Sequence, residues 1–194
     1  MSYFEILNLD REPFSNSPEP EFFFEAPQHV NCLQQLEISI RLRRGLNVVI
    51  GDVGTGKTTL SRMLIRKLHG DGSVEFHLLM DPDFGGPIQF LAGIARMMGA
   101  VESVHGLTEW QLKEAIKQHL FRRGVDEDKV VVLIIDEGQK LPGFCIEILR
   151  EFLNYETNRF KLLQIVLFAQ PEFNAILERR ENFADRMNVC LRLR

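Results

Sequence analysis

A glycine-rich stretch that follows a short apolar run constrains the fold more than any other part of this sequence. Residues 47–60 read N-V-V-I-G-D-V-G-T-G-K-T-T-L, and a helix-like segment continues from there. This is the G-x-x-x-x-G-K-[ST] pattern between a buried strand and the start of a helix, the setting that gives the pattern its meaning. The glycines let the backbone curl so that successive N–H groups point inward at phosphate oxygens, and the following helix adds the positive end of its dipole. The stretch predicts a phosphate-binding loop in an α/β domain.

The loop residues have distinct expected roles. The Lys57 ammonium is expected to bridge the β- and γ-phosphates of a nucleoside triphosphate, and the Thr58 hydroxyl to ligate Mg²⁺. The full set expected to bind the nucleotide is Gly51, Asp52, Val53, Gly54, Thr55, Gly56, Lys57, Thr58 and Thr59.

A second informative stretch is the apolar run V-V-V-L-I-I at residues 130–135, which is followed directly by Asp136 and Glu137. Six uninterrupted apolar residues indicate a central strand of a parallel sheet, buried on both faces. The acidic pair then lies at the carboxyl end of that strand, where open α/β sheets bind ligands. We expect Asp136 to hold Mg²⁺ together with Thr58, and Glu137 to activate the water that attacks the γ-phosphate.

The next apolar strand, residues 162–169, ends at Gln170. A polar side chain at that strand tip can reach the γ-phosphate or its attacking water, so Gln170 is a candidate sensor of the nucleotide. The alternative is an amide whose hydrogen bonds are satisfied within its own loop.

The remaining pattern predicts helices at residues 27–44, 59–69, 88–98, 108–123, 142–156 and 172–180, and further strands at 74–80 and 188–194. Residues 1–26 are rich in Phe and Pro and are expected to form an ordered arm on the core, either beside the nucleotide base or only covering apolar surface. Residues 27–194 form the predicted nucleotide-binding core, with the helix at 27–44 beside the nucleotide. The lone His77 is interpreted as a strand residue rather than a ligand.

Composition sets broad limits on function. A chain of 194 residues suits one α/β domain, and a net charge of −4 does not indicate nucleic-acid binding. Basic clusters at 41–44 and 62–67 fit either surface helix faces or a nucleic-acid contact. The three cysteines are far apart, which indicates a reduced, cytosolic setting. The N-terminus does not resemble a signal peptide and no apolar run is long enough to span a bilayer.

Other sequence features separate the classes of phosphate-loop protein. A GTPase would carry an Asn-Lys-x-Asp guanine reader, and residues 182–185 (N-F-A-D) lack its lysine. The Leu-Ser-Gly-Gly-Gln signature of transporter ATPases is also absent from the sequence. Glu137 directly after Asp136 favours a hydrolase over a small-molecule kinase. The helix-sized block at 85–124 favours the ATPase branch in which the two motif strands are not adjacent.

Together these motifs resemble the general secretion pathway protein A (ExeA-like) ATPases. Residues 13–20, P-F-S-N-S-P-E-P, are similar to that family's P-F-x-x-x-P-D-P opening, and G-D-V-G-T-G-K-T-T-L to its G-E-V-G-T-G-K-T-T-L. V-L-I-I-D-E-G-Q-K-L at 132–141 is similar to V-L-I-I-D-E-A-Q-N-L, and L-L-Q-I-V-L-F-A-Q-P-E at 162–172 to L-L-Q-I-V-L-x-G-Q-P-E. Pilus-biogenesis ATPases and transposition ATPases of the TnsC and MuB kind share much of this pattern.

The resemblance implies an AAA+ domain that hydrolyses ATP as a homo-oligomer, with an arginine from a neighbouring copy completing each site. Arg186 matches the position of the family's arginine finger, while Arg179 and Arg180 are alternatives, and all three are also compatible with plain surface charge. A finger stabilises charge on the transferring phosphoryl group.

The chain departs from the family pattern at a few positions. Gly138 replaces the usual Ala, and Ala169 the usual Gly; both exchanges are between small residues and are expected to be neutral. Lys140 replaces Asn. The helical lid, the transmembrane helix and the peptidoglycan-binding region of the full secretion proteins do not follow residue 194. We therefore expect a fragment of a longer protein, with weak nucleotide binding and slow hydrolysis when isolated.

These observations predict a three-layer α/β P-loop NTPase fold of the AAA+ type, with a five-stranded parallel sheet in the order 5-1-4-3-2. The expected function is ATP binding and Mg²⁺-dependent hydrolysis that drives assembly of a bacterial secretion or pilus apparatus. It would act at the cytoplasmic face of the inner membrane with a partner protein there. Two alternatives stay open: a DNA-binding transposition regulator, and a nucleotide-gated interaction module without turnover.

Overall fold

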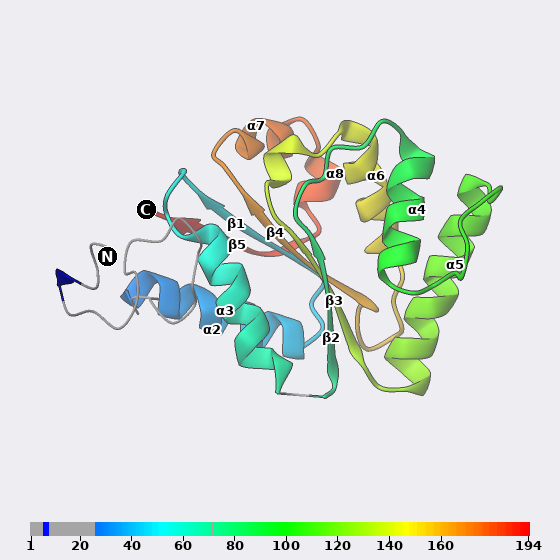
Figure 1. Ribbon diagram of the computed structural model, residues 1–194, viewed down its shortest axis with the longest axis horizontal. Helices are drawn as coiled ribbons and strands as arrows, with labels where there is room; N and C mark the ends of the chain where they lie inside the picture. The colour runs from blue at the N-terminus through cyan, green and yellow to red at the C-terminus, as the bar shows by residue number, and fades with distance from the viewer. Residues whose placement is uncertain (1–5, 8–25, 71) are drawn as a thin grey trace.

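The computed structural model describes residues 6–7, 26–70 and 72–194 (Figure 1). The predicted arm at residues 1–26 lies outside these ranges except for Ile6, Leu7 and Ala26. In chain order the elements are α2 (Pro27–Arg41), β1 (Leu46–Gly51), α3 (Lys57–His69), β2 (Val74–Leu79), α4 (Pro87–Met97), α5 (Glu109–Phe121), the π-helix η2 (Arg122–Asp126), β3 (Val130–Ile135), the 3₁₀ helix η3 (Gly138–Lys140), α6 (Gly143–Phe152), β4 (Leu163–Ala169), α7 (Phe173–Glu178), α8 (Glu181–Ala184) and β5 (Met187–Leu193).

The five strands form one sheet in the order β2-β3-β4-β1-β5, and every neighbouring pair is parallel. This is the predicted order 5-1-4-3-2 read from the other edge. The motif strands β1 and β3 are separated by β4, as the inserted block at 85–124 indicated. Because the strands are parallel, the segments that follow β1, β3 and β4 emerge at the same edge of the sheet.

Helices cover both faces of the sheet and make the molecule three-layered. Figure 1 shows α2 and α3, in blue and cyan, on one face and α4 to α8 on the other. Residues of β1, β3 and β4 are buried along their whole length, and their side chains alternate between the two cores. In β3, for example, Val132 and Ile134 pack with α2 and α3, whereas Val131, Leu133 and Ile135 join the opposite core.

The predicted helix ends were less accurate than the strands. A capping box opens α5, with Thr108 Oγ1 accepting from Gln111 N and Gln111 Oε1 accepting from Thr108 N. The sequence predicts this helix at 108–123, with Gly124 as its stop, but the helix passes after Phe121 into the π-helix η2. Gly124 does not cap the helix: a Cβ there would lie 2.9 Å from Leu162 Cδ2, so this glycine permits close packing.

Two further helix predictions need correction. The helices predicted at 27–44 and 142–156 end earlier, at Arg41 and Phe152. The segment between the last predicted helix and the last strand, to which the sequence analysis assigned no element, contains the short helix α8. Among the described residues, no helix combines the length and apolar character needed to cross a bilayer.

Candidate nucleotide-binding site

The glycine-rich loop connects the end of β1 to the first turn of α3, as the sequence predicted. Gly54 and Gly56 have φ values of 84° and 83°, a backbone region that side-chain-bearing residues rarely adopt. The loop is closed by the Thr55 hydroxyl, which donates to the Asp52 carbonyl at 2.8 Å. A Cβ on Gly51 would lie 2.6 Å from Thr55 Oγ1, so glycine is required where the strand enters the loop.

Lys57 lies in the first turn of α3, and its side chain turns back across the loop. Its ammonium donates to the carbonyl oxygens of Gly51 and Asp52, each at 2.8 Å, and the residue is only 7% exposed. The loop's own main chain therefore fixes the position of this buried cation at the carboxyl edge of β1. Val53, which was included among the expected nucleotide contacts, is 80% exposed at the outside of the loop.

The acidic pair lies directly across from the loop. Asp136 is buried, and its Oδ2 accepts a 2.8 Å hydrogen bond from the Thr58 hydroxyl. Its Oδ1 accepts from Glu137 N at 3.0 Å, and its own N–H donates to the Leu79 carbonyl of β2 at 2.9 Å. The hydroxyl and the carboxylate that the sequence assigned to one metal are thus in direct contact, although 78 residues separate them in the chain.

Glu137 and Gln170 also come together. Gln170 Nε2 lies 3.4 Å from Glu137 Oε2, at the adjacent tips of β4 and β3. Glu137 adopts φ 56°, in the left-handed region that is uncommon for residues other than glycine. Gly138 follows, and a Cβ there would lie 2.7 Å from Leu167 Cγ. The expectation that Gly and Ala are interchangeable at position 138 is therefore wrong for this chain.

The sequence interpretation missed two residues at this edge. Gln139 Nε2 donates to Glu137 Oε2 at 2.6 Å, and its position two residues after Glu137 was an available signal. His29 of α2 places Nε2 2.8 Å from the Thr55 carbonyl of the loop, consistent with the predicted position of that helix beside the nucleotide. Since a carbonyl oxygen only accepts, Nε2 carries the proton. A histidine 26 residues from its partner gives no local sequence signal.

The three candidate finger arginines lie elsewhere. Arg186 precedes β5, whose first residue Met187 pairs with Leu46, whereas Gly51 pairs with Leu193 at the other end. The intervening length of β1 places Arg186 roughly 17 Å along the sheet from the loop of its own chain. Any contact between Arg186 and such a loop therefore requires a second copy.

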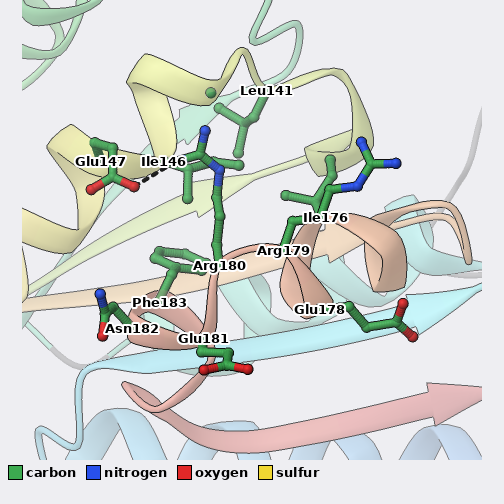
Figure 2. Close-up of a pocket in the computed structure, with 11 residues that line it drawn as sticks. Leu141, Ile146, Glu147, Ile176, Glu178, Arg179, Arg180, Glu181, Asn182 and Phe183 are labelled. Carbon is green, nitrogen blue, oxygen red and sulfur yellow. Dashed lines mark hydrogen bonds and ion pairs between the residues drawn. The ribbon is translucent and has the colours of Figure 1, made fainter.

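Arg179 and Arg180 line a pocket between α6, α7 and α8 (Figure 2). The Arg180 side chain reaches Glu147 of α6 and forms an ion pair with it, while Arg179 extends away from that carboxylate. The guanidinium groups of Arg179 and Arg186 make no ion pair with any residue in the described part of the chain. On this geometry Arg180 is engaged within its own chain, and the other two arginines are not.

The oxygen donors at this edge suit Mg²⁺. In the described ranges, no group of three or more His, Cys, Asp or Glu side chains is arranged to hold a metal. Mg²⁺ does not need such a group, because it usually binds through one or two protein oxygens together with substrate phosphates and water. Thr58 Oγ1 and Asp136 Oδ2, 2.8 Å apart, match that donor set.

Comparisons with known proteins agree with this fold. The family model described as "AAA domain" matches residues 40–177, more than half of the chain. General secretion pathway protein A of Aeromonas hydrophila is 31% identical over 175 residues, which is 90% of this chain but only 31% of that protein.

Solved structures support the fold alone, because their sequence identity is low. The ORC2 protein of Aeropyrum pernix aligns with a TM-score of 0.70 at 19% identity, over 95% of this chain and 51% of that one. CDC6P of Pyrobaculum aerophilum aligns with a TM-score of 0.69 at 19% identity, over 91% of this chain and 48% of that one. With the sheet order, the loop and the family match in agreement, this chain belongs to the AAA domain family and is an AAA-type ATPase domain related to general secretion pathway protein A.

Proposed function

We propose that this chain binds ATP and hydrolyses it with Mg²⁺ at the edge formed by the glycine-rich loop and the acidic pair. The observation that carries the proposal is the 2.8 Å contact between Thr58 Oγ1 and Asp136 Oδ2. It joins the two motifs across β4, and it supports a role as base for Glu137, the residue that follows Asp136. A fold that merely contained a glycine-rich turn would not need this contact.

Each residue has one task in the proposed reaction. The N–H groups of the loop and the Lys57 ammonium bind the phosphates, and Thr58 and Asp136 would hold Mg²⁺, which neutralises charge on the β- and γ-phosphates. The Glu137 carboxylate accepts a proton from water as the water oxygen bonds to the γ-phosphorus. The bond from that phosphorus to the β–γ bridging oxygen breaks, and the products are ADP and inorganic phosphate.

The site is tested by two substitutions with opposite signatures. Lys57→Ala should abolish binding of MgATP, measured by calorimetry, because it removes the buried cation. Glu137→Gln should keep binding and stop phosphate release. Lys67→Ala, on the same helix in a surface ion pair with Glu37, is the matched control and should change neither quantity. Unchanged turnover in Glu137→Gln would refute the role of Glu137.

We further propose that hydrolysis drives assembly of a secretion or pilus apparatus at the cytoplasmic face of the inner membrane, in a homo-oligomer that works with a membrane partner. The support is the relationship to general secretion pathway protein A, of which this chain matches less than a third. Retention of a tagged full-length protein on inner-membrane vesicles, with ATP-dependent release of a co-purifying partner, tests this role.

The described surface does not favour the alternative of a DNA-binding regulator. One basic groove lies between residues 42–44 and 156–161. Two of its cations are already engaged, Arg43 with Asp128 and Lys161 with Glu156. Salt-dependent binding of duplex DNA in the presence of ATP would reverse this judgement. Tight ATP binding without phosphate release at high protein concentration would instead indicate a nucleotide-gated interaction module.

A further inference from the structure

Gln139 lies between Glu137 and the tip of β4, and its amide group contacts both. Nε2 donates to Glu137 Oε2 at 2.6 Å, and Oε1 accepts from the backbone N–H of Gln170 at 3.0 Å. A backbone N–H can only donate, so the amide oxygen must face Gln170 and the NH₂ group must face the carboxylate. The main chain of a neighbouring strand thereby decides which end of this amide meets Glu137.

The backbone that carries Glu137 is fixed from both sides. Lys140 N donates to the Glu137 carbonyl at 2.8 Å and Leu141 N to the Gly138 carbonyl at 3.1 Å, which forms η3. Leu167 of β4 fills the space where a side chain on Gly138 would lie. These contacts explain how a glutamate is kept in a left-handed conformation. They do not set the direction of its side chain, which has three further rotatable bonds.

That direction is set by amide donors. Among the hydrogen bonds of the described residues, Glu137 Oε2 accepts from Gln139 Nε2 at 2.6 Å and from Gln170 Nε2 at 3.4 Å. The shorter bond to a charged acceptor is the stronger of the two. Gln139 is therefore the principal restraint on the carboxylate, and the Gln170 side chain is the secondary one.

We propose that Gln139 is a positioning residue that aims the Glu137 carboxylate and couples its direction to the tip of β4. The inference rests on the proposed ATP hydrolysis and names a residue that acts through Glu137. Engaging Oε2 leaves Oε1 as the oxygen that takes the proton from water. The side-chain hydrogen bonds of Gln139 run to Glu137 and Gln170, not to the glycine-rich loop, so Gln139 affects the rate of the chemical step rather than nucleotide affinity.

The test variant is Gln139→Met, which keeps the length of the side chain and removes both polar groups. We expect kcat to fall about tenfold to a hundredfold, because a misplaced catalytic group costs this much. KM for ATP, and the Kd of a non-hydrolysable analogue with Mg²⁺, should stay within about twofold of the parent, the signature of an interaction used only in the transition state. Gln118→Met is the matched control, since Gln118 donates to Glu114 on the exposed side of α5. It should change none of these values.

A second variant separates positioning from simple packing. Gln139→Glu keeps the shape and the acceptor for Gln170 N, but it turns a carboxylate toward Glu137 instead of a donor. Its kcat should fall at least as far as that of Gln139→Met. Its thermal unfolding midpoint should stay close to the parental value, so that unfolding does not account for the lower kcat. Parental kcat in either variant, or a raised KM with kcat unchanged, would overturn the inference.

Failure of the Gln139 proposal can be distinguished from failure of the proposed ATP hydrolysis. An active parent, an inactive Glu137→Gln and an unaffected Gln139→Met overturn only the role of Gln139. A parent without turnover overturns the function and with it the role of Gln139 in turnover.

The contact between Gln139 and Glu137 can be observed by NMR of ¹⁵N-labelled protein. The side-chain NH₂ signal of Gln139 should be shifted and protected from hydrogen exchange, and Glu137→Ala should remove both effects. A solvent-like NH₂ signal in the parent would contradict the contact.

Discussion

Two glutamines lie at opposite ends of strand β4, Gln164 near its amino end and Gln170 just past its carboxyl end. Their side chains make different kinds of contact. Gln164 is fully buried; its Oε1 accepts from Gly45 N at 2.7 Å and its Nε2 donates to the Lys161 carbonyl at 2.8 Å. Gln170 is partly exposed, and its side chain contacts the Glu137 carboxylate instead. The Gln164 amide satisfies main-chain groups, whereas the Gln170 amide contacts the side chain of the proposed base.

The same contrast holds for the two edges of the sheet. At the amino edge, Ser39 donates to Asn47 at 2.5 Å and accepts from Asn188 at 3.0 Å, so three polar side chains from α2, β1 and β5 satisfy one another. At the carboxyl edge, Thr58 and Asp136 contact each other with oxygen atoms that also suit a metal. Polar groups at the amino edge satisfy one another within the fold, and those at the carboxyl edge form the site that we propose for a ligand.

The largest expected effect tests the apparent exception to this division, Arg186. It lies at the amino edge, yet the family resemblance predicts it as the arginine finger, a role it could fill only in the site of another copy. Arg186→Ala should lower phosphate release on the order of a thousandfold at protein concentrations where copies associate. The unfolding midpoint should not move. Phosphate release measured against protein concentration is the assay.

Two arginines provide the controls for this substitution. Arg179→Ala should keep parental turnover, because Arg179 is a free surface charge among the described residues. Arg180→Ala should lower stability modestly through loss of the ion pair to Glu147. Parental turnover in an associated Arg186→Ala protein would remove Arg186 as the finger, and a loss in Arg179→Ala would move that role there.

The second prediction compares the two glutamines of β4 directly. Gln164→Leu leaves the Gly45 N–H and the Lys161 carbonyl without partners in a buried place, so we expect a loss of about 2–4 kcal/mol in the free energy of unfolding. Affinity for MgATP should be unchanged in the folded protein. Gln170→Leu should show the reverse, with a small change in stability and slower phosphate release. Equal effects on stability, measured by urea unfolding, would contradict the division between the two edges.

The features that were predictable from sequence depend on local pattern. The runs V-V-I at 48–50 and V-V-V-L-I-I at 130–135 identify central strands because burial on both faces leaves no polar position within them, and the glycines of the loop have φ values that only glycine adopts easily. Contacts between distant segments were not predictable in this way. His29 against Thr55 and Leu167 against Gly138 arise from how α2 and β4 pack, and no periodicity in the sequence encodes either pairing.

The third prediction concerns that packing at the carboxyl edge. Gly138→Ala brings a methyl group to within 2.7 Å of Leu167 Cγ, and relieving the clash requires a shift of the Leu167 side chain, of β4 or of the acidic loop. Overpacking of this kind costs about 1–3 kcal/mol, and turnover should fall with it because Glu137 is the neighbouring residue. Gly70→Ala is the control: its φ is −72°, nothing lies within 4 Å of the added carbon, and stability should be unchanged. Unaltered stability and turnover in Gly138→Ala would show that the loop moves freely over Leu167.

The smallest expected effect lies away from both edges, in the histidines buried between β2 and α5. Burial lowers the pKa of His77 and of His119 below the ordinary value of 6.5, and this outweighs the nearby Glu75 carboxylate. Between the lowered pKa values and 6.5 the unfolded chain binds more protons than the folded one. Stability should therefore be complete above about pH 6.5 and should decline as the pH falls below it.

His119→Phe should weaken this decline, because it removes one of the two buried imidazoles while keeping the site apolar. The same substitution at exposed His105 should leave the parental pH dependence. Urea unfolding at pH 7.5 and at pH 5.5 measures the difference. Because neither histidine contacts the loop or the acidic pair in the described hydrogen bonds, nucleotide affinity corrected for the folded fraction should not follow the same profile. A matching profile would mean that the α4–α5 side of the sheet is coupled to the carboxyl edge, and that the division between stabilising and ligand-directed polar groups is less complete than Gln164 and Gln170 indicate.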